Sequence, residues 1–311
     1  MSTPTLAFAT PRKLPKPSEL HGRVVVLDVA FASEASGGGF QKLTLPLIMG
    51  LGTRLVAWVD HHDHVEHATY ASDPRFVLAR KADHGACPEM VTEELVARVG
   101  PVDTIVCHTD FDGLASAAKW ILGGKEPYPG ADDDARAIDT RIGKPSSTAE
   151  RIDRAIRARG RDYGLLGAIV RLLVSKLGDV ALWEPIDRAA AELREIERAT
   201  RKLAEGYVRY DLGKSAFPAA KTLAYVDVTG KDVRYDKTLL LLAGQERASL
   251  AVLVDRDTLT LAAPFDSGIN FLELLGLSGG MPTLVSVPKA RLADALRGLG
   301  VTTWDRDGIV G

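Results

Sequence analysis

The sequence predicts an α/β protein with a parallel sheet, a helical connector and a second, smaller α/β unit. Three observations support this fold class. Short apolar runs alternate with helix-forming stretches in the first half of the chain, and continuous apolar runs are typical of strands buried on both faces of a parallel sheet. A middle region rich in Ala, Glu and Arg has few strand signals. Apolar runs of strand length then return in the last third.

The composition fits a globular chain of about two domains. The chain has 311 residues, 46 % of them hydrophobic and 26 % charged, and domains average roughly 150 residues. The formal net charge of −2 excludes the global basic excess that draws a protein onto long nucleic acid or an anionic membrane. There are two cysteines, no stretch approaching ~20 apolar residues and no signal-peptide pattern at the N-terminus. We therefore expect no disulfide scaffold, no membrane partner and a cytoplasmic protein.

The elements of the first half follow in order. Residues 1–20 contain four prolines and few apolar residues, which indicates a flexible, extended N-terminal arm. Residues 21–145 should form the parallel-sheet domain. Its apolar runs predict strands at 24–27, 55–59, 76–79 and 104–107, and the segments between them predict helices at 40–52, 88–99 and 113–122.

The rest of the chain divides at about residue 215. Residues 146–215 should form the helical connector, because Glu and Arg interleave at helical spacing in 149–154 and 189–198, as on a solvated helix. Residues 216–311 should form the smaller α/β unit, with strands at 224–228, 250–254, 258–262 and 283–287 and helices at 237–242 and 289–299.

Polar clusters follow three of the first four predicted strands. Asp28 follows the first, Asp60-His61-His62 the second, and the segment 108–113, His-Thr-Asp-Phe-Asp-Gly, the fourth. The carboxyl ends of strands in open α/β sheets form the edge where ligands bind. Carboxylates gathered there raise one another's pKa unless a cation neutralises them. Imidazole with carboxylate suits Mn²⁺, and oxygen ligands alone suit Mg²⁺. Two ions about 3.5–4 Å apart, as in phosphoryl hydrolases, would use all these side chains.

Each motif also has an ordinary explanation when it is taken alone. An aspartate after a strand usually caps a helix or a turn, which would account for Asp28. The triplet Asp60-His61-His62 can be a polar loop. A helix-capping Asp-Gly, however, would not explain the presence of His108 and Asp110 in the third motif. Three polar motifs at the ends of successive strands favour a shared site. The remaining histidines nearby, His64, His67 and His84, fall outside this pattern and are expected to be surface or loop residues.

These motifs resemble the DHH phosphoesterase family, which includes RecJ nucleases, small-oligonucleotide phosphatases and related pyrophosphatases. The triplet Asp60-His61-His62 matches the motif that names the family, residues 108–117 resemble its first motif, and residues 24–28 resemble its second. Residues 82–89 resemble the loop that follows the triplet. Residues 277–282, Leu-Ser-Gly-Gly-Met-Pro, resemble the glycine-rich signature of the associated DHHA1 domain.

Two departures from the family pattern stand out. The family usually runs from the first motif to the second and then to the triplet, whereas here the second motif and the triplet come first. A circular permutation explains this order without moving a side chain in space. The glycine signature normally ends in a His that contacts substrate phosphate, and Met281 stands at that position.

The resemblance implies the following roles. The chain would be a DHH-type phosphoesterase that hydrolyses phosphate esters or anhydrides of small nucleotides or short oligonucleotides by a two-metal mechanism, with two Mn²⁺ ions or with Mg²⁺. His62 would contact the scissile phosphate, and Asp60 would orient a neighbouring imidazole. Gly279 and Gly280 would bind substrate. The metal ligands would be Asp28, His61, His108, Asp110, Asp112 and a fourth-motif aspartate, for which Asp139 is the candidate and Asp132, Asp133 and Asp134 are rivals.

Two other functions remain open at this point. Met281 motivates a catalytically weakened, metal- and nucleotide-binding regulatory protein, and the family also allows a polyphosphate or pyrophosphate hydrolase. Processing of long nucleic acid, as by RecJ, is not expected from a short chain of net charge −2. The expected partner is a small nucleotide or short oligonucleotide, and a homodimer is possible.

Overall fold

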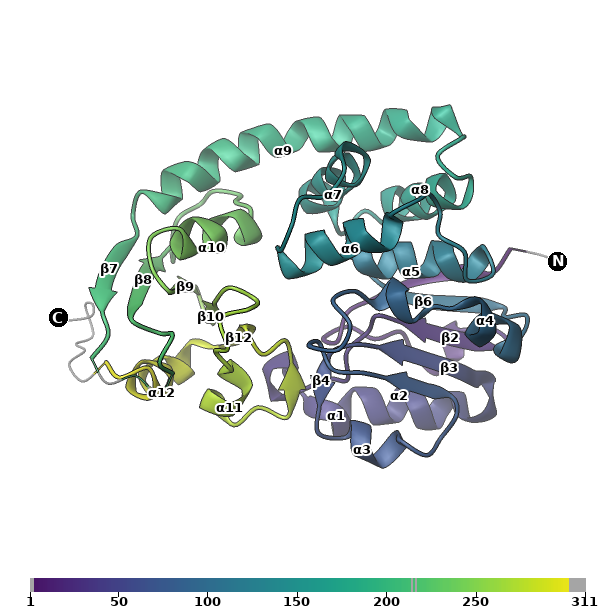
Figure 1. The fold of residues 1–311 in the computed structure, drawn as a ribbon, viewed down its shortest axis with the longest axis horizontal. Coiled ribbons are helices and arrows are strands. Elements are labelled where there is room, and N and C mark those ends of the chain that lie inside the picture. Colours follow the sequence, from purple (N-terminus) through teal and green to yellow (C-terminus); the bar gives the residue numbers. More distant parts are fainter. Residues whose placement is uncertain (1–2, 214, 216, 302–311) are drawn as a thin grey trace. The chain divides into compact units, whose positions relative to one another are not determined.

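The computed structural model describes residues 3–213, 215 and 217–301. The chain divides into two compact units, Met1–Leu193 and Arg194–Gly311 (Figure 1). Each unit is built around a five-stranded sheet with helices, so the predicted α/β class is confirmed. Over the described residues, no helix is both long and apolar enough to cross a bilayer.

The sheet of the first unit is parallel throughout, with the strand order β1-β6-β2-β3-β5. All four strands predicted for this region are present, each within one residue of its predicted end. Side chains of the central strand alternate between the two faces, with Val25 and Leu27 in one apolar core and Val24 and Val26 in the other. The strands are β1 (Thr5–Ala9), β2 (Val24–Leu27), β3 (Leu55–Asp60), β5 (Phe76–Leu78) and β6 (Thr104–His108), and the short β4 (Asp63–His64) follows β3.

Helices cover both faces of this sheet (Figure 1). On one face the core contains side chains of α1 (Gly39–Lys42), α2 (Thr44–Leu51) and α3 (His67–Tyr70). On the other face it contains side chains of α4 (Glu93–Val99), α5 (Phe111–Ile121), α6 (Ala131–Thr140), α7 (Ser147–Arg159), α8 (Tyr163–Val174) and the start of α9 (Trp183–Ala204). Short 3-10 helices lie at η1 (Pro17–Glu19), η2 (Glu34–Ser36), η3 (Gly52–Arg54), η4 (Cys87–Met90) and η5 (Val180–Leu182).

The N-terminal segment is not the extended arm that the sequence predicted. Residues 5–9 form β1, which pairs in parallel with β6 from Thr5↔Thr104 to Ala9↔His108. Leu6 and Phe8 pack against the core on one side and Ala7 against the core on the other. This five-residue segment, apolar after Thr5, lies between prolines, and as an edge strand it leaves one row of backbone groups unpaired by the sheet.

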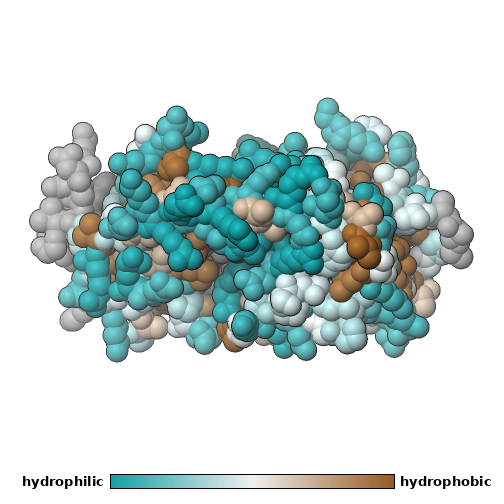
Figure 2. Space-filling model, turned by 90° about the horizontal axis from the view of Figure 1, so that it is seen from above, coloured by the Kyte–Doolittle hydropathy of each residue, from teal (hydrophilic) through white to brown (hydrophobic). Residues whose placement is uncertain are grey.

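The predicted connector also differs from the structure. The apolar faces of α7 and α8, including Ile152, Leu166 and Ile169, are buried in the same core as the sheet. Residues 147–193 are therefore part of the first unit, because the Glu and Arg side chains that indicated a solvated helix occupy only one side of each helix. Figure 2 shows the face along which α9 runs, and the outer side of this helix is mostly hydrophilic.

The second unit has a mixed sheet with the order β12-β10-β9-β8-β7. Only β8 and β9 pair in parallel, and the other neighbours are antiparallel. The four strands expected here are present. The elements are β7 (Val208–Asp211), β8 (Thr222–Asp227), α10 (Lys237–Gln245), β9 (Leu250–Asp255), β10 (Thr258–Ala262), α11 (Phe271–Leu275), β11 (Gly279–Gly280), β12 (Leu284–Pro288), η6 (Lys289–Arg291) and α12 (Leu292–Gly298). The last ten residues of the predicted unit, 302–311, lie outside the described residues.

Candidate metal centre

The candidate site lies at the carboxyl edge of the first sheet. The chain passes from the central strand β2 to β3 on one side, and later returns to place β6 on the other side of β2. The connections between strands therefore run in opposite directions on the two sides of β2. Ligands of open α/β sheets bind at such a switch point. Asp28 directly follows β2, Asp60 ends β3 and His108 ends β6. The parallel arrangement therefore brings the three polar motifs predicted from the sequence to one edge.

Asp28 is the most constrained residue of the site. Its φ of 59° is left-handed, a conformation that Asp tolerates better than most residues, and its backbone N–H donates to Val59 O at 2.8 Å. The side chain is 1 % exposed, and neither carboxylate oxygen has a hydrogen-bond partner among the described residues. Burial and the negative charges of Asp112 and Asp110 raise the pKa of Asp28 well above its usual range. A buried carboxylate with unsatisfied oxygens fits a cation ligand.

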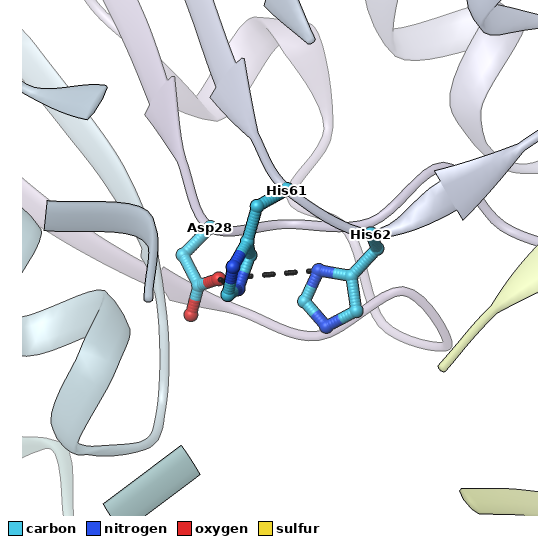
Figure 3. Close-up of side chains that lie close together, drawn as sticks. All are labelled: Asp28, His61 and His62. Carbon is cyan, nitrogen blue, oxygen red and sulfur yellow. Dashed lines mark ion pairs between the residues drawn. The ribbon is translucent and has the colours of Figure 1, made fainter. Parts of the chain in front are cut away.

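The two histidines of the triplet point toward this carboxylate (Figure 3). His61 Nε2 lies 3.2 Å from Asp28 Oδ1, and its Nδ1 lies 2.9 Å from His84 O. His62 Nδ1 lies 2.8 Å from Asp60 Oδ1, which is the contact expected of an aspartate that orients a neighbouring imidazole. Burial opposes the charged form of Asp60, but the charge of His62 and its hydrogen bond outweigh burial and lower the pKa of Asp60.

The third motif joins β6 to the start of α5. Asp110 caps α5, since its Oδ1 accepts from Gly113 N at 3.0 Å, and its Oδ2 lies 2.6 Å from His108 Nδ1. Burial lowers the pKa of His108, but the charge of Asp110 and this hydrogen bond raise it overall to about 9. Asp112, in the first turn, accepts from Cys87 N at 2.9 Å and lies 3.2 Å from His61 Nε2.

The candidate for the fourth aspartate reaches the cluster from α6. Asp139 Oδ2 lies 3.8 Å from His61 Nε2. The three rivals lie elsewhere: Asp132 pairs with Lys119, Asp133 is exposed, and Asp134 accepts hydrogen bonds from Tyr128 and Ser146.

Lys81 belongs to the cluster and was missed from the sequence. Its Nζ lies 2.8 Å from His61 Nε2 and forms an ion pair with Asp139 Oδ2, and its side chain is 2 % exposed. Burial lowers the pKa of Lys81, but the charges of Asp139, Asp112 and Asp28 raise it overall to about 12. A single lysine beside an arginine in a loop predicts a solvated side chain. The position of Lys81 in the cluster is therefore visible only in the structure.

The protonation of His61 is set by opposing contacts. Burial disfavours a charge on its ring, and the carboxylates of Asp112 and Asp28 favour one and raise its pKa. The ammonium of Lys81 acts against that charge, and at 2.8 Å it contacts a nitrogen that accepts a hydrogen bond only without a proton. The carboxylates prevail and raise the pKa of His61 to about 11, and Nδ1 donates to His84 O.

Within the described part of the chain, three groups of side chains bring potential ligand atoms within 4.8 Å of one another: Asp28, His61 and His62; Asp28, His108 and Asp110; and His61, Asp112 and Asp139. All six residues predicted as metal ligands are thus placed in one cluster. The mixture of imidazole and carboxylate donors, together with the unsatisfied oxygens of Asp28, fits a divalent cation. Gly279 and Gly280 form β11 in the second unit, and their predicted role in substrate binding stays a prediction.

Two of the three histidines expected to be surface or loop residues lie instead in β4 and α3 and are buried or half-buried. His64 is 9 % exposed, and its ring lies 5.6 Å from that of Phe31. The His67 ring lies 5.1 Å from the same phenylalanine at nearly a right angle. Both histidines, His67 as the first residue of α3, thus pack against Phe31 in an aromatic cluster. His84 is in a loop as expected, but its carbonyl oxygen contacts His61.

Gly113 allows α5 to approach the end of β6. A Cβ at this position would lie 2.6 Å from His108 O and 2.7 Å from His108 Cβ, closer than real contacts allow. We expect Gly113→Ala to displace His108 and to weaken Mn²⁺ affinity by about 10–100-fold, the range seen when the support of a metal ligand is disturbed. Titration with Mn²⁺, followed by calorimetry, measures this change.

Gly167→Ala provides the control for that experiment. It adds the same methyl group inside α8, where the new Cβ meets only the flexible end of Arg171 at 3.4 Å. Equal Mn²⁺ affinity of both variants would show that the close approach at Gly113 does not position His108.

Sequence comparisons with known protein families and curated proteins find no match. Among solved structures, a crystal structure of exonuclease RecJ bound to manganese is similar, with a TM-score of 0.44 and 16 % sequence identity over 91 % of this chain and 75 % of that chain.

Proposed function

We propose that this chain is a metal-dependent phosphoesterase of the DHH type. One observation carries the proposal: the ends of β2, β3 and β6 bring Asp28, His61 and His108 together, buried or largely buried, with Asp110, Asp112 and Asp139 beside them. Clusters of this composition serve phosphoryl hydrolysis when divalent ions are bound, because the ions neutralise phosphate charge and lower the pKa of water.

The roles of the individual side chains follow from their contacts. Asp28, His108 and Asp110 would hold one ion, and His61, Asp112 and Asp139 form the neighbouring group. Asp60 holds the Nδ1 side of His62, so the Nε2 of this ring is left to face a phosphate oxygen of the substrate. His62 is 18 % exposed, whereas Asp60 is fully buried, as expected of a residue that meets substrate and a residue that supports it.

The proposed substrates are phosphate esters or anhydrides of small nucleotides or short oligonucleotides. The chain carries no global basic excess for a long nucleic acid. We also propose that the second unit acts as a DHHA1-like domain, in which the backbone of Gly279 and Gly280 binds phosphate. The same proposal includes a cytoplasmic location and a homodimer.

Hydrolysis of bis(4-nitrophenyl) phosphate with Mn²⁺ tests this function. We expect release of nitrophenol by the wild type, and a loss of more than about 100-fold in Asp110→Asn, because removal of a ligand should exceed the 10–100-fold cost of removing its support. Asn is as good a helix cap as Asp, so α5 should remain intact in this variant. Asp133→Asn removes the same charge from an exposed position of α6 and should keep wild-type activity.

The result also separates the proposal from a regulatory protein that binds metal without turnover, the alternative that Met281 motivates. No release of nitrophenol by wild type that holds Mn²⁺ would favour that alternative. Equal activity of Asp110→Asn and wild type would show that the cluster is not the active site. A panel of short oligonucleotides, cyclic dinucleotides, adenosine bisphosphate and polyphosphate then identifies the substrate.

A further inference from the structure

Lys81 places a fixed positive charge inside the cluster. Its ammonium nitrogen lies 2.8 Å from His61 Nε2 and pairs with Asp139 Oδ2. These are two of the three residues in the group His61, Asp112 and Asp139. The side chain is among the largest fully buried ones in the described part of the chain, and burial of a lysine is costly unless its charge is paired.

The loop that carries Lys81 is tied to the site along its length. The backbone N–H of Lys81 donates to Asp63 Oδ2 at 3.2 Å. Three residues on, His84 O accepts from His61 Nδ1, and Cys87 N donates to Asp112. One loop thus supplies the ammonium and also fixes the orientation of two of the residues around it. These contacts hold Lys81 in the cluster rather than as a mobile surface side chain.

The ammonium and a divalent ion would compete for the same atoms. His61 Nδ1 donates to His84 O, so Nε2 is the ring nitrogen left to face the cluster, and Lys81 Nζ lies 2.8 Å from it, where an ion bound to Nε2 would lie. A small divalent ion lies about 2 Å from its ligand atoms. An ion bound to His61 and Asp139 would therefore touch Lys81 Nζ, and two positive charges in direct contact at a buried position repel strongly.

We propose that the Lys81 ammonium is the resident cation of the group His61, Asp112 and Asp139, so that the protein holds one divalent ion, at Asp28, His108 and Asp110, in place of two. This inference rests on the proposed function for the ion that remains. It departs from the two ions that the resemblance implies. In this arrangement Lys81 is a positioning residue that neutralises the carboxylates and fixes His61.

Metal stoichiometry tests this inference without a measurement of activity. The full-length protein is dialysed against excess Mn²⁺, and bound manganese is measured by mass spectrometry and by electron paramagnetic resonance. We expect one ion per chain in the wild type, with the six-line spectrum of an isolated Mn²⁺. In Lys81→Ala we expect two ions per chain and the spectrum of an exchange-coupled pair. Lys119→Met removes another buried ammonium, which pairs with Asp132 outside the cluster, and should keep one ion.

Each outcome decides a different statement. Two coupled ions in the wild type would overturn the role of Lys81, and this measurement needs no variant to fold. One ion in both Lys81→Ala and Lys81→Gln would overturn it as well, because the group would then bind no ion even without the ammonium. No bound ion in the wild type or in Lys81→Ala would overturn the proposed metal site, and the inference with it.

Discussion

Asp28→Asn should reduce Mn²⁺-dependent phosphoesterase activity by more than about 100-fold. Asp28 would hold the ion together with His108 and Asp110, and loss of even a supporting contact of a metal ligand costs about 10–100-fold. Asn has the shape of Asp and also accepts the left-handed φ of 59° found here. The substitution therefore removes the charge without forcing the turn after β2 to change. Steady-state kinetics and a Mn²⁺ titration measure the effect.

The same variant should be more stable than wild type in the absence of metal. Both oxygens of Asp28 are buried without hydrogen bonds, and the charges of Asp112 and Asp110 repel them. Removal of this carboxylate should relieve its burial and its repulsion by the neighbouring aspartates, and stabilise the apo protein by about 1 kcal/mol, or ~2–4 °C in melting temperature for a unit of this size. Addition of Mn²⁺ should then raise the melting temperature of wild type and leave that of Asp28→Asn unchanged.

Asp133→Asn serves as the control here too, since it removes a carboxylate from solvent and should change neither the apo melting temperature nor the response to Mn²⁺. A lower apo stability in Asp28→Asn would mean that this carboxylate stabilises the fold by itself. The left-handed conformation of Asp28 would then serve the fold and not metal binding.

Most of the site was predictable because its residues follow apolar strands. Val24–Leu27 and the runs at 55–59 and 104–107 are buried on both faces, so each reads as a strand and ends at a polar motif. In a parallel sheet these ends meet at one edge whatever the order of the motifs along the chain. The sheet order confirms that the reordered motifs still converge.

The residues that were missed have no comparable local signal. Lys81 enters the cluster through a loop whose path depends on contacts of His84 and Cys87 with distant residues. His64 and His67 are polar by type, but their rings pack edge-on against Phe31, which only the tertiary fold brings near. The strand β1 lies between prolines and exists because β6 offers it a free edge. Each of these features depends on contacts between residues far apart in the sequence, and not on the local periodicity of hydrophobic residues.

Without divalent ions, the free energy of unfolding should fall as the pH rises from about 6.5 to about 9. The charge of Asp110 and its hydrogen bond raise the pKa of His108 to about 9 in the folded protein, against about 6.5 in the unfolded chain. The folded state thus binds this proton more tightly. The resulting stability is complete below pH 6.5 and is lost through pH 9, an effect of up to about 3 kcal/mol.

Mn²⁺ should reverse this slope. An ion held by His108 needs a neutral ring, so metal affinity, and with it the stabilisation by saturating Mn²⁺, should grow over the same pH range. Urea unfolding at pH 6.5, 7.5 and 9, with chelator and then with Mn²⁺, measures both slopes. His108→Gln should flatten the chelator curve and remove the response to metal, because it deletes the proton that Asp110 stabilises. A chelator slope that persists in His108→Gln would assign the proton to another group, and an unchanged slope with Mn²⁺ would show that His108 is not a ligand.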